Sequence, residues 1–181
     1  KNLSNFEINS TGTLIYFVRD GDVFSADLKA VGNSFVAKKN QITRCNNVNN
    51  PNYTTNTGMA YATDMEMDPN SDEIAYIISN INHVMQKINP VTCEVIDSIG
   101  KGFATSTANT KEDSGNLPAA KVGFNDARNI TVVGDKIIVS AFSGYIDEFD
   151  RTKFNATEED EAWLQQMGGQ RIRRWDGVKD A

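Results

Sequence analysis

The feature that most constrains this chain is a pattern of short apolar strands and tight turns that occurs three times. Leu14, Ile74 and Ile137 hold equivalent places in the three copies, so the interval is about 60 residues. Each copy reads as a meander of three or four antiparallel strands. An isolated meander of this size is only marginally stable, so the copies are expected to stack face to face and bury their apolar sides.

The first copy contains the clearest turn. Two runs rich in β-branched and aromatic residues, 13–18 and 23–28, flank Asp20-Gly21. An Asp-Gly pair between two such runs predicts a β-hairpin, because glycine tolerates the positive φ that tight hairpin turns require. A third run, 34–37, returns beside them.

The other two copies consist of similar runs. Their expected strands are 73–79, 83–88 and 92–99 in the second copy, and 129–133, 136–142 and 145–149 in the third. Alternation of apolar and polar residues in these runs is typical of half-buried strands. Asn89-Pro90 and Gly134-Asp135 supply turn residues between them.

Residues 10–28, STGTLIYFVRDGDVFSADL, resemble the TolB-type (WD-like) β-propeller repeat. The second copy departs from that repeat, since Asp72 stands at the turn glycine and Asn80 to Asn82 replaces the Asp-Gly turn. The third copy, over 139–150, is more similar to quinoprotein-type propeller repeats. The resemblance covers about half of the chain and implies blade-like architecture. It implies no particular activity, because propellers have many unrelated functions.

We therefore predict one all-β, propeller-like domain over 1–181, with about three blades. The expected units are 5–43, 64–99 and 128–175. Segments 44–62 and 100–125 lack periodicity and are expected to be loops between blades.

One short C-terminal helix is expected over 157–167. Thr157 suits its N-cap, the acidic residues 158–161 suit its positive end, and Gly168-Gly169 ends it.

The length of 181 residues is unusual for this architecture. Propellers usually have four to eight blades, so three blades rarely close a ring. The chain is thus either a segment of a larger propeller or a unit whose edges are closed by partner subunits. Because it begins at Lys1 without a leader, we expect a mature product or an excised fragment.

Composition excludes several classes of function. The net charge of −6 argues against nucleic acid or an anionic membrane as the main partner. The longest apolar runs are far shorter than the roughly 20 residues that a transmembrane helix needs. The single histidine provides few ligands for the metal site of a metalloenzyme. No glycine-rich phosphate loop or Gly-x-Ser-x-Gly elbow occurs in the sequence. We expect no metal, no cofactor and no catalytic residues.

Cys45 and Cys93 are the two cysteines of the chain. In an extracellular protein they are expected to form a disulfide that links the Asn-rich loop to the second unit. The alternative is two unrelated thiols, one of them buried in a strand. Catalysis by Cys93 is disfavoured, because His83 is the only histidine that can serve as its base.

Five Asn-x-Ser/Thr sequons occur, which is a modest excess over chance for this composition. They begin at Asn2, Asn9, Asn52, Asn129 and Asn155. In a secreted eukaryotic protein they predict surface glycosylation. The alternative is that they are accidents of an Asn-, Ser- and Thr-rich sequence.

Two polar segments are candidate binding sites. Residues 68–73 resemble the start of a calcium loop but lack its glycine and its final glutamate, which favours a simple turn. The cluster of Arg171, Arg173, Arg174 and Trp175 is predicted to bind a partner. Self-association is favoured over an external anion or aromatic ligand, because the acidic residues 158–161 offer a complementary surface in the same or a neighbouring subunit.

The leading functional hypothesis is a secreted or cell-surface binding or structural module without catalysis, which associates with itself or with a partner protein. The repeats, the sequons and the lack of catalytic residues support it. The alternative is the propeller portion of a larger hydrolase or peptidase, since TolB-like repeats often accompany such catalytic domains.

Overall fold

A computed structural model describes residues 4–31, 34–45, 59–100, 115–118, 122–124, 127–142, 144–153 and 171–176. These residues form antiparallel strands, one short 3-10 turn (η3, Arg151–Lys153) and connecting turns, with no α-helix among them. They therefore include no helix long and apolar enough to cross a membrane. The predicted helix over 157–167 lies outside the described residues.

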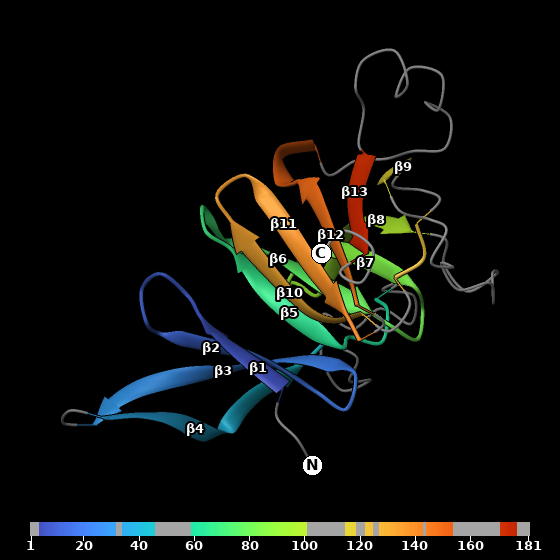
Figure 1. Cartoon of the computed structure of the whole chain (residues 1–181). Helices are drawn as coiled ribbons and strands as arrows, with labels where there is room; N and C mark the ends of the chain where they lie inside the picture. The colour runs from blue at the N-terminus through green and yellow to red at the C-terminus, as the bar shows by residue number, and fades with distance from the viewer. Residues whose placement is uncertain are drawn as a thin grey trace.

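The strands form three antiparallel sheets that follow one another along the chain (Figure 1). The first sheet contains β1 (Ser4–Ile8), β2 (Leu14–Arg19), β3 (Asp22–Val31) and β4 (Ser34–Arg44) in that order. The second contains β5 (Asp64–Asp68), β6 (Ser71–Ser79), β7 (Val84–Asn89) and β8 (Glu94–Gly100). This all-β, meander-by-meander architecture confirms the predicted propeller-like fold.

The third sheet is larger. It contains β10 (Ala127–Val133), β11 (Lys136–Ala141) and β12 (Tyr145–Asp150), followed by β13 (Arg171–Asp176) and β9 (Gly115–Pro118). Strand β9 arises from 100–125, which sequence reasoning assigned to a loop. Its pairing partner β13 lies more than 50 residues further along the chain, and Gly115 aligns with Arg174. Pairing over that separation leaves no local sequence signal.

Turn chemistry determines where the hairpins fold. Asp20 and Gly21 connect β2 to β3 with φ angles of 51° and 85°, as the Asp-Gly pair predicted. Asp68 ends β5, and its Oδ1 accepts a hydrogen bond from the Asn70 amide at 2.8 Å. The segment 68–73 is thus a side-chain-stabilised turn, which agrees with the turn interpretation over the calcium loop.

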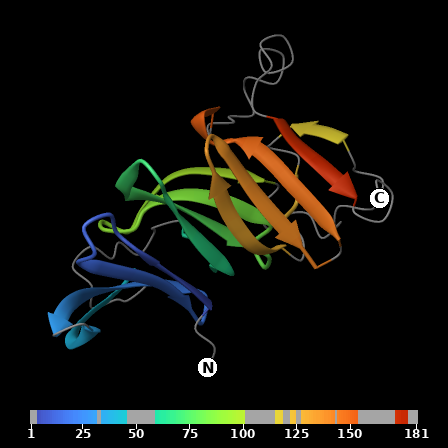
Figure 2. The same ribbon diagram turned by 60° about the vertical axis from the view of Figure 1, so that its left-hand side comes forward.

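Two apolar clusters hold the sheets together. One lies between the first and second sheets and includes Tyr16, Val18 and Ile77, and the other lies between the second and third sheets and includes Ile78 and Phe149. The middle sheet therefore packs against a neighbouring sheet on each face, and residues 75–79 of its strand β6 are all buried. Figure 2 shows the three sheets side by side in this order.

The first strands of the three sheets lie next to one another. β5 contacts both β1 and β10, so the middle sheet joins its neighbours along this line as well as through the apolar clusters. The Ile130 amide of β10 donates a hydrogen bond to Asp64 Oδ2 of β5 at 3.0 Å. This arrangement leaves one face of the first sheet and one face of the third sheet at the two ends of the stack.

Candidate functional site

The outer face of the first sheet carries a row of aromatic side chains. Phe6 of β1 aligns with Phe17 of β2, which aligns with Phe24 of β3. The rings of Phe17 and Phe24 are stacked, with centroids 5.2 Å apart and planes within 3° of parallel. Ile8 and Ile15 form the next aligned pair. We call these five residues the aromatic face.

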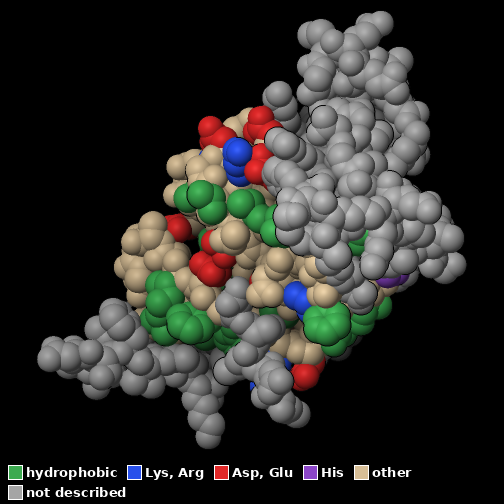
Figure 3. All heavy atoms as spheres, viewed as in Figure 1, with side chains coloured by type: hydrophobic (Ala, Val, Ile, Leu, Met, Phe, Trp, Pro, Cys, Tyr) green, Lys and Arg blue, Asp and Glu red, His purple; other side chains and the backbone are tan. Residues whose placement is uncertain are grey.

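Strand alternation explains why these residues face outward. Tyr16 and Val18 are buried in the cluster against the second sheet, so their neighbours Ile15 and Phe17 point to the opposite side of β2. Phe6 is 66% exposed and Ile8 is 48% exposed. Figure 3 shows hydrophobic side chains gathered at the lower left, over the part of the molecule where β1 and β2 lie. Large apolar side chains that cluster on a surface are typical of an interaction site.

The outer face of the third sheet has a different character. Val133 and Ile146 are exposed there. They lie among polar groups, however, and an ion pair joins Lys136 Nζ to Glu148 Oε1 at 2.8 Å. Asn129 is also exposed. This mixed composition is typical of a solvated sheet face.

Three carboxyl groups meet where the first strands of the first two sheets come together. Glu7 of β1 forms a side-chain hydrogen bond with Glu66 of β5, and Asp64 lies close enough to affect the charge of both. Tyr16 aligns with Glu7 on the neighbouring strand. Burial is the largest cause of a raised Glu7 pKa, and together with the charges of Glu66 and Asp64 and the hydrogen bond with Glu66 it raises that pKa to about 7.

Because the pKa of Glu7 is higher in the folded chain than in the unfolded chain, folding favours its protonated form. The contribution of this pKa shift to the free energy of unfolding is fully present below the usual pKa of 4.5 and is lost as the pH rises through about 7. We expect the melting temperature to fall between pH 5 and pH 8, and Glu7→Gln to reduce that fall. Exposed Glu94→Gln serves as a control. An equal decline in the wild type and in Glu7→Gln would show that Glu7 does not carry the effect.

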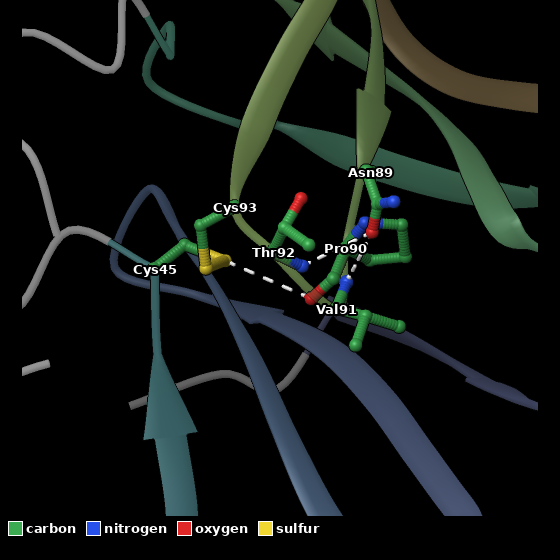
Figure 4. Close-up of a disulfide and its surroundings, with 6 residues drawn as sticks. All are labelled: Cys45, Asn89, Pro90, Val91, Thr92 and Cys93. Atoms are coloured by element: carbon green, nitrogen blue, oxygen red, sulfur yellow. Dashed lines mark hydrogen bonds between the residues drawn. A yellow bond between two sulfur atoms is a disulfide. The ribbon is translucent and has the colours of Figure 1, made fainter. Parts of the chain in front are cut away.

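The structure joins Cys45 and Cys93 in a disulfide, which confirms that prediction (Figure 4). Their Cα atoms are 5.2 Å apart. Cys45 directly follows β4, and Cys93 lies in the turn before β8. The bond therefore links the first sheet to the second, and both cysteines are buried in the cluster between them.

Two of the five sequon asparagines are described. Asn129 is exposed on β10. Asn9 is only 9% exposed, and its Nδ2 donates to the hydroxyls of Thr11 and Thr13 while its Oδ1 accepts from the backbone amides of Thr13 and Leu14. A glycan on Nδ2 would interrupt this network, so the geometry gives Asn9 a structural role in the turn between β1 and β2. Asn2, Asn52 and Asn155 lie outside the described residues.

The predicted partner-binding segment is an internal strand of the third sheet. β13 lies between β12 and β9, with Arg173 aligned with Glu148 and Arg174 aligned with Asp147. Arg171 and Trp175 belong to the same strand. Self-association through these residues stays a prediction, and the acidic segment 158–161 lies outside the described residues.

The described residues contain no group of three or more His, Cys, Asp and Glu side chains that suits a metal ion. His83 lies in the turn between β6 and β7 with a φ of 57°. Sequence reasoning missed the aromatic face, although the alternation of Phe6 and Ile8 and of Ile15 and Phe17 was visible. The pattern does not reveal which side of a strand another sheet covers.

Comparisons with known proteins found similarity in structure alone. No known protein family and no curated protein matches the sequence. The solved structure of Kluyvelomyces marxianus Hsv2 is 9% identical and has a TM-score of 0.41, over 82% of this chain and 35% of that chain. Apo AztD from Citrobacter koseri is 16% identical with a TM-score of 0.44, over 95% of this chain and 36% of that chain.

A second structure of Citrobacter koseri AztD is 13% identical with a TM-score of 0.38, over 95% of this chain and 48% of that chain. Hsv2 and AztD are both β-propeller proteins. The chain spans between about a third and a half of the length of these structures.

Proposed function

We propose that this chain is a non-catalytic binding module of a secreted or cell-surface protein, and that it associates with a second copy of itself. The aromatic face is the proposed contact surface. The observation that carries the proposal is the exposure of Phe6 and Ile8 beside the stacked rings of Phe17 and Phe24. Packing two such faces together removes from water the kind of apolar surface that the chain already buries between its own sheets.

Charge favours this face over others for contact between identical copies. With a net charge of −6, two copies repel one another. The five residues of the aromatic face are uncharged, so approach through them adds no further repulsion. A two-fold contact is also self-complementary by symmetry, because the same patch serves both partners. The polar outer face of the third sheet suits solvent instead, and the Asn129 sequon on β10 fits that role.

The disulfide supports an oxidising compartment as the place where the chain works. Glycosylation at Asn129 belongs to the same proposal, since an extracellular eukaryotic protein would carry a glycan on an exposed sequon. The TolB-type resemblance of residues 10–28 supports the assignment of the sheets to blades.

Sedimentation of the disulfide-bonded chain tests the proposal. We expect the wild type to dimerise with increasing concentration, and Phe6→Ser to weaken dimerisation at least tenfold, because burial of a phenylalanine side chain is worth about 1.5–3 kcal/mol. Phe6 is two-thirds exposed, so the variant is expected to keep its fold. Ile96→Ser is the matched control, since Ile96 is 47% exposed on β8 of the middle sheet.

Ile146→Ser distinguishes the two terminal sheets. Ile146 is exposed on the third sheet, and its replacement is expected to leave the dimer unchanged. Association that is lost in Ile146→Ser but kept in Phe6→Ser would place the contact on the third sheet and refute the proposal. A wild type that stays monomeric at every soluble concentration would also refute it.

A further inference from the structure

A pocket of about 360 Å³ opens at the end of the molecule where the β2–β3 and β6–β7 turns lie. All three sheets contribute to it. The residues that matter for its chemistry are Asp20, Gly21, Tyr61, Thr63, Ile81 and Arg128. This volume lies in the usual range for sites that bind small molecules. The pocket does not include any residue of the aromatic face.

The walls of the pocket are held in place by the backbone. The Tyr61 ring lies directly against Gly21, where a Cβ atom would collide with it, so only glycine fits this turn. The Tyr61 amide donates to Asn82 Oδ1 at 2.7 Å. Thr63 Oγ1 donates to Asn80 Oδ1 at 2.9 Å and accepts from the Asn80 amide at 3.1 Å. The segment before β5 is thus fixed to two turns that belong to different sheets.

Arg128 differs from Arg19 and Arg151, the other arginines whose side chains the structure describes. Arg19 and Arg151 each pair with carboxylates. Arg128 is exposed on β10 and forms no ion pair with any described residue. Its Cζ lies 5.6 Å from the centroid of the Phe142 ring, which is 80% exposed. A cation–π contact of this kind holds a guanidinium in place while leaving its N–H groups available for an anion.

We propose that this pocket binds a ligand that carries a carboxylate next to an apolar group. Arg128 binds the carboxylate, and Tyr61 and Ile81 contact the apolar group. Tyr61 and Ile81 are 46% and 55% exposed, so both are accessible to a ligand. The same chemistry occurs in small aromatic acids and at the free C-terminus of a peptide that ends in an aromatic residue.

Calorimetric titration with matched probes tests the proposal. The first pair is 3-phenylpropionate and 3-phenylpropanamide, and the second is acetyl-Gly-Gly-Phe as the free acid and as the amide. We expect at least one acid to bind at least tenfold more tightly than its amide, because the amide cannot form a charge-assisted pair with Arg128. The tighter of the two acids identifies the source of the ligand. Equal binding of acid and amide in both pairs, or no binding by any probe, would refute the proposal.

Variants test whether the preference for the acid over the amide arises from this pocket. Arg128→Gln is expected to abolish the preference for the acid over the amide while leaving the melting temperature unchanged. Lys136→Gln is the matched control, because it removes the same charge at the opposite end of the β10–β11 hairpin. A loss of the acid preference in Lys136→Gln as large as in Arg128→Gln would show a general effect of net charge and refute the site. Repeating the titration on Phe6→Ser separates this site from self-association, because that variant lacks the proposed dimer contact.

Discussion

Replacement of both Cys45 and Cys93 by alanine is expected to lower the free energy of unfolding by about 4 kcal/mol. The bond closes a loop of 48 residues, and loop-closure entropy gives a stabilisation of that size. Urea denaturation of the oxidised wild type and of the double variant measures the difference. Alanine is preferred to serine because both cysteines are buried, and a buried hydroxyl without a partner adds its own cost.

The surroundings of the disulfide explain why its loss is expected to affect both the first and the second sheet. Asn89 Oδ1 accepts hydrogen bonds from the Val91 and Thr92 amides at 2.9 and 3.0 Å, which shapes the turn that presents Cys93 (Figure 4). The Cys45 amide donates to the Val23 carbonyl, so the other end is tied to β3.

Reduction provides the control for this prediction. A reductant is expected to destabilise the wild type by a similar amount and to leave the double alanine variant unchanged. If the wild type and the double variant unfolded at the same urea concentration under oxidising conditions, the disulfide would contribute nothing to stability.

Arg151→Met is expected to lower the free energy of unfolding by about 3 kcal/mol, because it leaves a buried carboxylate without its cation. Arg151 Nη1 donates to Asp68 Oδ2 at 2.7 Å, and the side chains are 10% and 5% exposed. Tyr76 donates its hydroxyl to the same oxygen at 2.7 Å. Arg151 Nη2 also pairs with Asp135 at 3.1 Å, and its Nε donates to the Gly134 carbonyl. Arg151 therefore joins the third sheet to the second.

This network also predicts a pH dependence. Burial alone would raise the pKa of Asp68, but the hydrogen bonds from Tyr76, Asn70 and Arg151 outweigh it and hold that pKa below its usual value. The stabilisation is therefore present at neutral pH and is lost as the pH falls below about 4. The sign is opposite to that for Glu7, so the two carboxyl groups affect different pH windows.

Lys136→Met is the matched control for Arg151→Met. Lys136 forms an ion pair with Glu148 at 2.8 Å, but its side chain is 57% exposed. An exposed pair of this kind contributes about 0–1 kcal/mol, so the variant is expected to have little effect. Equal destabilisation by the two variants would contradict a special role for the buried pair.

The position of the hairpins was predictable because turn chemistry is local. Asp20-Gly21 has the residue types that a two-residue turn with positive φ requires, and the structure places both residues in that conformation. The three meanders follow from alternating apolar residues in short runs, which need no information from elsewhere in the chain. The choice between a disulfide and two thiols needed the fold, since sequence alone does not bring Cys45 and Cys93 together.

The sequence by itself therefore determined the hairpin strands of the three meanders and their tight turns, because each depends on residues close together in the chain, but it did not reveal β1, β5 or β9. Only the tertiary structure decided which apolar side chains are covered. Ile77 and Phe17 lie in similar strands, but Ile77 belongs to the middle sheet and is fully buried, whereas Phe17 faces outward on a terminal sheet. The pocket beside Arg128 likewise requires turns of the first two sheets to meet the start of β10 in the third sheet. Local alternation cannot determine either feature, because both depend on which sheets pack against one another.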